Sequence, residues 1–273
     1  MEKKKVLFIS QEIFPFLPKS EISATSRRLP QVVQEVGKEI RVFTPRFGAI
    51  NERRHQLHEV IRLSGLNISI DDQDHPLIIK VASVSAARMQ VYFIDNDDYF
   101  KRKTTVEDEK GSFHEDNDER AMFFCHGVLE TVKKLGWQPD VIHCHGWLTG
   151  IMALYIKHVY SKDPHFKDTK VVYSFYNDAF TAPWNERFAE KMKHDNMPQE
   201  IVDKLKDTSF LNITKVITEN CDGVNIAVEN LSPDLQAIYD AAECMKLDYV
   251  SEEHQAKELS AFFDKVIEAN VLA

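Results

Sequence analysis

Long hydrophobic runs, paired cysteines and an excess of positive charge are all missing from this 273-residue sequence. No apolar stretch approaches the roughly 20 residues that a transmembrane helix needs. The apolar run Val6–Ile9, near the basic N-terminus, is too short for a signal peptide and has no cleavage site. The four cysteines form no C-x-x-C pair, which favours reduced thiols over a disulfide framework. We therefore expect a cytoplasmic protein with no membrane partner.

The charge balance excludes a second class of function. The net charge is −9, whereas general nucleic-acid binding requires a basic surface, and no basic patch with interleaved aromatics is present. Hydrophobic residues make up 43% of the chain and charged residues 28%, which is typical of a soluble globular protein. We expect no nucleic-acid partner.

Glycine-rich phosphate loops and nucleophile elbows are also absent, which disfavours a small α/β enzyme of another kind acting through His145. Cys144 lies between His143 and His145, but neighbouring strand residues point to opposite faces, so these three side chains cannot converge on a metal ion. The acidic runs Glu107–Glu109 and Glu115–Glu119 are more typical of a solvated loop than of a cation site. No metal and no cofactor are expected.

Short buried strands alternate with amphipathic helices along the chain. Strands are predicted at Lys5–Ser10, Glu39–Thr44, Val141–His143, Lys170–Phe175 and Gly223–Ala227. Helices are predicted at 26–37, 117–135, 149–160, 186–207, 210–220, 232–240 and 252–270. Alternating runs within 57–70 and 77–94 predict an added β-hairpin region, and 101–118 predicts a polar surface loop. The pattern predicts one three-layer, Rossmann-like α/β domain over residues 1–273 with a mostly parallel sheet.

The segment Pro139–Gly150 holds the most informative residues. A buried strand ends there at His143, Cys144 and His145, and Gly146 and Trp147 follow before a helical pattern begins. Ligands of parallel α/β sheets bind beyond the carboxyl ends of the strands. His145 and Trp147 are therefore candidate ligand residues, although both could serve packing alone, and His143 is best interpreted as a core histidine.

Four collinear segments, within residues 3 to 230, resemble the N-terminal half of the bacterial glycogen and plant starch synthases, which are retaining glycosyltransferases of the GT-B fold. Lys5–Phe16 matches the opening strand and its S-x-E-x-x-P-F turn, and Thr44–Asn51 matches M-P-R-Y-G-x-I-N. Val91–Arg102 matches V-Y-F-I-D-N…Y-F-x-R, and Leu135–Gly150 matches L-G-W-x-P-D-V-I-H-x-H-D-W-x-T-G. The resemblance implies glucosyl transfer from a nucleotide-glucose to an α-1,4-glucan.

The same resemblance implies site residues, and it shows where this chain departs from the family. Lys19 would meet phosphate, His145 would meet a sugar hydroxyl, and Trp147 would form the wall or stack on a sugar ring. Asn177 would line the cleft, although the histidine of the family's H-N motif is absent here. The family's paired glycines after the lysine are absent: the stretch reads Lys19-Ser20-Glu21-Ile22-Ser23-Ala24, and Glu21 adds a negative charge. A side chain in place of such a glycine hinders close approach of a ligand.

The resemblance also implies a second domain of on the order of 150 residues that carries most of the sugar-nucleotide site. Only one or two helices are predicted after Ile238, so we expect a first half that is incomplete or inactive alone. A separate C-terminal-half partner or a homodimer could complete the cleft. The alternative is a non-catalytic carbohydrate-binding or regulatory module with a synthase-like fold.

Overall fold

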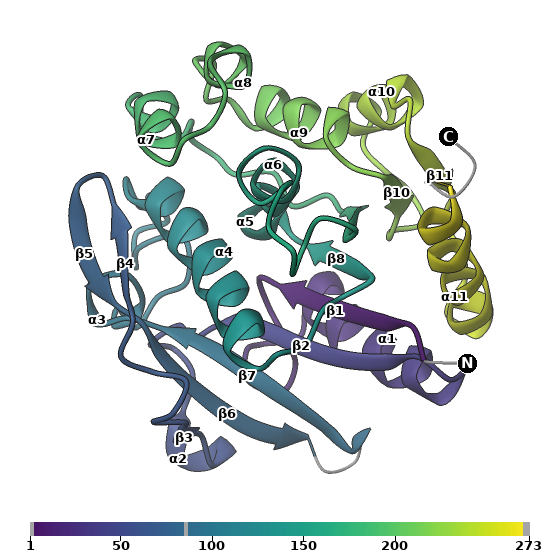
Figure 1. Cartoon of the computed structure of the whole chain (residues 1–273), viewed down its shortest axis with the longest axis horizontal. Coiled ribbons are helices and arrows are strands. Elements are labelled where there is room, and N and C mark those ends of the chain that lie inside the picture. Colours follow the sequence, from purple (N-terminus) through teal and green to yellow (C-terminus); the bar gives the residue numbers. More distant parts are fainter. Residues whose placement is uncertain (1–2, 85–86, 270–273) are drawn as a thin grey trace.

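The computed structural model describes residues 3–84 and 87–269. Within these residues, the main sheet has nine strands in the order β11-β10-β9-β8-β1-β2-β7-β6-β3, and β4 and β5 form a separate hairpin (Figure 1). The strands are β1 Lys5–Ser10, β2 Glu39–Pro45, β3 His58–Glu59, β4 Asn67–Ile70, β5 Gln73–Pro76, β6 Ile78–Val84, β7 Met89–Asp95, β8 Val141–His145, β9 Lys170–Phe175, β10 Gly223–Ile226 and β11 Met245–Leu247.

Helices follow most of the parallel strands. They are α1 Glu21–Glu35, α2 Glu52–His55, α3 Asp97–Phe100, α4 Asn117–Lys134, α5 Trp147–Gly150, α6 Met152–Leu154, the π-helix η2 Tyr155–Val159, α7 Phe188–His194, α8 Gln199–Lys204, α9 Phe210–Glu219, α10 Pro233–Ala241 and α11 Glu252–Glu268. None of the helices in the described ranges is long and apolar enough to cross a membrane.

The centre of the sheet is parallel and the β3 edge is antiparallel. β1 pairs in parallel with β2 on one side and with β8 on the other, and β8 pairs in parallel with β9. β6 runs antiparallel to both β7 and β3, as expected for the hairpin region. The mostly parallel α/β sheet with added hairpins is thus confirmed.

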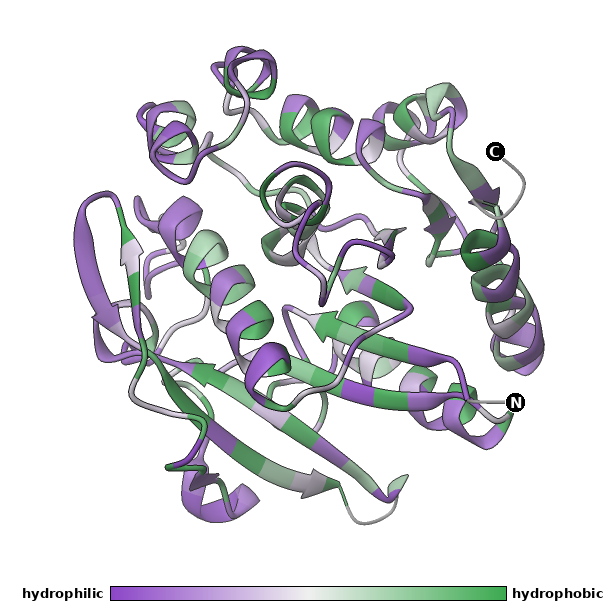
Figure 2. Cartoon of the chain, in the orientation of Figure 1, coloured by the Kyte–Doolittle hydropathy of each residue, from purple (hydrophilic) through white to green (hydrophobic). Residues whose placement is uncertain are grey.

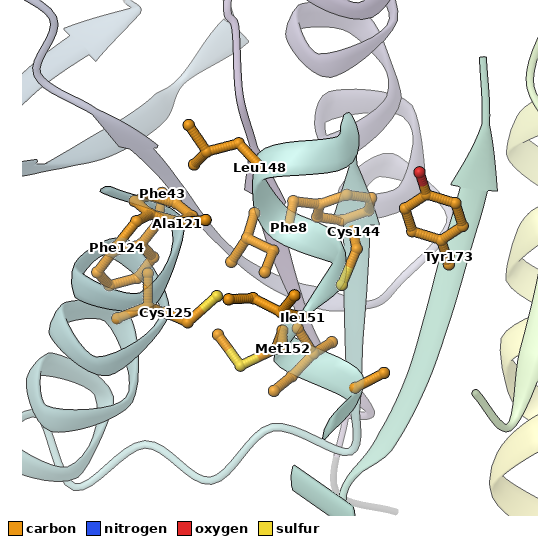
Figure 3. Packing of buried hydrophobic residues seen from close by; sticks show 14 of the residues in the cluster. Phe8, Phe43, Ala121, Phe124, Cys125, Cys144, Leu148, Ile151, Met152 and Tyr173 are labelled. Carbon is orange, nitrogen blue, oxygen red and sulfur yellow. The ribbon is translucent and has the colours of Figure 1, made fainter. Parts of the chain in front are cut away.

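Helices cover both faces of the sheet, which gives three layers. α4, α5, α6 and α9 lie over the face to which Cys144 points, and Figure 3 shows Cys125 of α4 near Ile151 and Met152 in this part of the core. On the opposite face, α11 lies beside α1, and its Phe263 ring contacts the rings of Phe8 and His143. The strands between these layers are mostly hydrophobic, while the outward sides of the helices are hydrophilic (Figure 2).

Four local features differ from the sequence-based expectation. Helix α1 begins at Glu21 rather than at Ser26, because Ser20 and Ser23 form a capping box in front of it. The single helix expected at 149–160 is divided into α5, α6 and η2, and the one expected at 186–207 is divided into α7 and α8. Asp118, expected on a solvated loop, is fully buried and forms an ion pair with Lys191 at 2.8 Å.

We expect Phe263→Ala to lower the free energy of unfolding by about 3 kcal/mol or more, because removal of a buried ring leaves a cavity. Phe263 is 0% exposed between α11 and the sheet. Chemical denaturation measures the loss. The control is Lys257→Ala on the exposed side of the same helix, which should change stability by no more than about 0.5 kcal/mol. Equal small effects of both variants would show that α11 contributes little to the fold.

Candidate functional site

A pocket of about 270 Å³ lies beyond the carboxyl ends of β1, β8 and β9. We call it the strand-end pocket; its lining residues are Gln11, Glu12, Ser20, Glu21, Ile22, Val106, Glu107, Phe113, Trp147, Tyr176, Asn177, Asp178, Ala179 and Phe180. Parallel pairing accounts for its position: Ser10 lies opposite His145, and His145 lies opposite Ser174. The three chain segments that leave these strands therefore diverge side by side, as at the ligand sites of other parallel sheets.

The first turn of α5 forms the floor between these segments. Its N-cap residue, Gly146, has a φ of 86° and supplies no capping side chain. Two neighbouring segments cap the helix instead: Asp178 Oδ2 accepts a hydrogen bond from the Trp147 amide at 2.9 Å, and Gln11 Oε1 accepts one from the Leu148 amide at 3.2 Å. These bonds satisfy helix-end amides that would otherwise be free to bind a ligand.

Aromatic rings form one wall of the strand-end pocket. The centroid of the Trp147 ring lies 5.6 Å from that of Phe113 and 5.4 Å from that of Phe180, and the Phe113 and Phe180 rings stack at 5.4 Å. Trp147 is only 4% exposed, whereas Phe113 and Phe180 are half-buried. The predicted site residue Trp147 therefore supports the wall, and the two phenylalanines present more of the surface.

Phe113 is carried by the loop between α3 and α4, and a buried arginine holds that loop. Arg120 donates a hydrogen bond to the Thr105 carbonyl oxygen at 2.7 Å, and Asn117 donates one to the Val106 carbonyl oxygen at 2.8 Å. An isolated antiparallel bridge joins Glu107 to Phe113, so the loop brings a carboxylate and a ring to the pocket together.

His145 lies beneath the strand-end pocket rather than in its lining. It is 0% exposed; its Nδ1 lies 2.8 Å from the Tyr176 hydroxyl, and its Nε2 lies 3.2 Å from Nδ1 of His143. Burial lowers the pKa of His145 well below its ordinary value, and the neighbouring His143 lowers it further. A sugar hydroxyl would reach this ring only if Tyr176 moved.

His143 continues this buried polar chain. Its Nε2 lies 2.7 Å from Ser174 Oγ and 3.1 Å from Asn225 Oδ1, and burial lowers the pKa of His143 to about 4. If the Tyr176 hydroxyl donates to His145, His145 can donate to His143, and His143 to Asn225. With both imidazoles neutral, every group in this chain of hydrogen bonds then has a partner. The prediction that His143 is a satisfied core histidine agrees with these contacts.

The other two predicted site residues lie nearer to solvent. Asn177 is exposed in the lining, where its amide donates to the Asn230 carbonyl oxygen at 2.8 Å and its Oδ1 accepts from the Ser232 amide at 2.9 Å. Lys19 is exposed and lies next to the lining residue Ser20, but it is not itself part of the lining. The structure thus brings Trp147 and Asn177 together, with Lys19 beside the pocket and His145 below it.

Four carboxylates line the strand-end pocket: those of Glu12, Glu21, Glu107 and Asp178. The pKa of Asp178 is raised to about 7, chiefly by burial and to a smaller extent by the negative charge of Glu12. Its Oδ1 atom is buried and has no hydrogen-bond partner in the described structure. Among residues 3–84 and 87–269, no three His, Cys, Asp or Glu side chains are grouped as metal ligands.

Several of these residues were not singled out from the sequence. Gln11 and Glu12 directly follow the first strand, a position that could have drawn attention to them. Glu107 was considered only as part of an acidic run on a solvated loop, and Phe113 carried no signal, because this polar loop reaches the pocket only through tertiary contacts.

The structure is an α/β domain with a pocket at the carboxyl ends of its parallel strands, and comparisons with known proteins show its family. The family described as "Starch synthase catalytic domain" matches residues 5–244. The glycogen synthase of Pelodictyon phaeoclathratiforme is 32% identical over 255 residues, which cover 93% of this chain and 51% of that protein. The glycogen synthase of Chlorobium limicola is 39% identical over 174 residues, which cover 63% of this chain and 36% of that protein.

Among solved structures, the catalytic domain of Starch Synthase IV from Arabidopsis thaliana, bound to ADP and acarbose, matches with a TM-score of 0.67 and 18% identity. The match covers 97% of this chain and 50% of that one, and it shows the shared fold. The chain belongs to the starch synthase catalytic domain family. It spans about a third to a half of the length of the two glycogen synthases above, with 36% and 51% covered.

Gly146→Ala should destabilise the protein more than Gly65→Ala does. Both glycines have a positive φ, of 86° and 89°, which costs a non-glycine residue about 1–3 kcal/mol. A Cβ at position 146 would also lie 2.8 Å from Gln11 Cβ, whereas one at position 65 would meet nothing within 4 Å. Denaturation of both variants separates the two effects, and equal losses would contradict the close contact at Gly146.

Asp178→Asn should gain stability relative to the parent as the pH rises from about 4 to about 7. The folded protein holds a proton on Asp178 that the unfolded chain releases near its ordinary pKa of 3.8, so the parent loses stability over this interval. The slope approaches about 1.4 kcal/mol per pH unit and vanishes above pH 7. Denaturation at a series of pH values tests this, since a pH-independent difference between the two proteins would exclude the raised pKa.

Proposed function

We propose that this chain is the acceptor-binding half of an α-glucan glucosyltransferase, and that the strand-end pocket receives one end of an α-1,4-glucan. The observation that carries the proposal is the composition of the pocket: half-exposed phenylalanine rings on one side and carboxylate oxygens on the other. Pyranose rings pack on aromatic faces, and their hydroxyl groups donate to carboxylates. Membership of the starch synthase catalytic domain family supports a glucan as the ligand.

In this proposal, Trp147 backs the aromatic wall, Asn177 contacts sugar hydroxyls at the outer edge, and Lys19 meets phosphate of a nucleotide-glucose held outside the pocket. His145 positions Tyr176 through the bond to its hydroxyl. Glucosyl transfer also requires groups that stabilise a departing diphosphate. A second half, or a partner chain that supplies one, would bring those groups. The free cysteines, three of them buried, support a reducing, cytoplasmic location.

Phe113→Ala should weaken the binding of maltohexaose about tenfold, because the variant loses one ring of the aromatic wall and roughly 1.4 kcal/mol of packing. Calorimetric titration of the parent and the variant measures the change. Tyr249→Ala removes an aromatic ring that is exposed and lies outside the pocket lining, so it should leave the affinity unchanged. A folded parent that binds no maltohexaose would overturn the proposal.

A second candidate is a carbohydrate-binding module without catalytic activity. The observation that favours it is that Ser20 and Glu21, at the position of the family's paired glycines, form the start of α1 and leave no open loop. A transfer assay with ADP-glucose and maltohexaose, run with a glycogen synthase C-terminal half added, separates the two. Glucan elongation identifies a synthase half, and glucan binding without elongation identifies a module.

A further inference from the structure

The strand-end pocket has an acidic lining. It is lined by four carboxylates, and no lysine, arginine or histidine is among its lining residues. None of the ion pairs between described residues involves Glu12, Glu21, Glu107 or Asp178. The negative charge of Glu12, Glu21 and Glu107 therefore acts on whatever enters the pocket, whereas Asp178 holds a proton below about pH 7.

The contacts of these carboxylates leave the charge uncompensated. Glu12 accepts a hydrogen bond from the Ser20 hydroxyl at 2.5 Å, and Glu107 accepts one from the Thr181 hydroxyl at 3.4 Å. Both donors are neutral. Glu21 is exposed in the first turn of α1, where its side chain is free to face an incoming ligand.

Two nearby arginines are engaged elsewhere, and Lys19 lies beside the pocket but outside its lining. Arg28 points to α11, where it donates to the Glu252 carbonyl oxygen at 3.3 Å and pairs with the Glu252 carboxylate at 3.7 Å. Arg102 pairs with Asp116 at 2.5 Å. Neither of these arginines contributes to the pocket lining.

The N-termini of the two helices at the pocket do not provide a phosphate site either. The first amides of α5 are already bonded to Asp178 and Gln11. At α1, the Ser20 hydroxyl accepts from the Ser23 amide at 3.0 Å, and Glu21 places a negative charge where the helix dipole would attract an anion. Both sources of positive potential that a helix supplies are thus satisfied by the protein.

We infer that Glu21 and Glu107 are specificity residues that exclude phosphate from the strand-end pocket and reserve it for phosphate-free sugar. A diphosphate carries at least two negative charges and is repelled by each carboxylate. A neutral glucan experiences no such repulsion, and its hydroxyl groups can donate to the same oxygens. The inference rests on the proposed function only in taking a glucan as the admitted ligand.

The test is the double variant Glu21→Gln/Glu107→Gln, titrated calorimetrically with ADP and, separately, with maltohexaose. The amide side chains keep the size of the glutamates and remove two charges. The affinity for ADP should rise about tenfold or more over that of the parent. The matched control is Glu253→Gln/Glu258→Gln, which removes the same two charges from exposed positions on α11. That variant should show no such rise.

The two ligands test the specificity role of Glu21 and Glu107 and the proposed glucan binding separately. An equal rise in both variants, or none in either, would overturn the role of Glu21 and Glu107. Absence of maltohexaose binding by the folded parent would overturn the proposed function alone, because the ADP comparison between the two variants would still decide the inference. If the double variant fails to fold, each single variant can be titrated, and each should show a smaller rise of the same sign.

Discussion

The parallel register of β1, β8 and β9 is the constraint on which the rest of the site depends. It sets Ser10, His145 and Ser174 in one row across the sheet. The residues that follow each strand then lie next to one another with no further adjustment. A shift of one residue in β8 would turn Cys144 toward α11 and the histidines toward α4, so that neither the core nor the pocket would fit.

That register buries the polar side chains of His143 and His145 in the sheet. The structure tolerates them because both imidazoles are neutral and hydrogen-bonded. The two imidazoles are linked between Tyr176 and Asn225, and burial lowers the pKa values of both. Buried polar groups are tolerated when each has a partner. Because this chain of bonds lies directly under the pocket, it fixes the position of Tyr176.

The sequence predicts the sheet better than it predicts the site. Strands β1 and β9 contain continuous apolar runs, and β2, β8 and β10 are short segments in which most residues are apolar, a pattern that follows from burial. The three-residue strand β11 is too short to show a period, and the early start of α1 depends on a Ser20–Ser23 cap that lacks the usual glutamate or glutamine. Trp147 and Asn177 could be placed at a strand end from the chain alone, but the depth of His145 depends on Tyr176, which packs over it.

The capping of α5 ties the pocket to the order in which the chain folds. Its two caps come from residues that follow β1 and β9, and the bond from Leu148 to Gln11 spans 137 residues of sequence. Contacts of such long range form only after much of the loop-closure entropy has been lost, so they tend to form late. The helix end is therefore completed only once three distant strands have paired. Local opening of β9 would remove the Asp178 cap from α5 and disrupt the pocket in the same event. The pocket and the strands β1, β8 and β9 therefore form one cooperative unit.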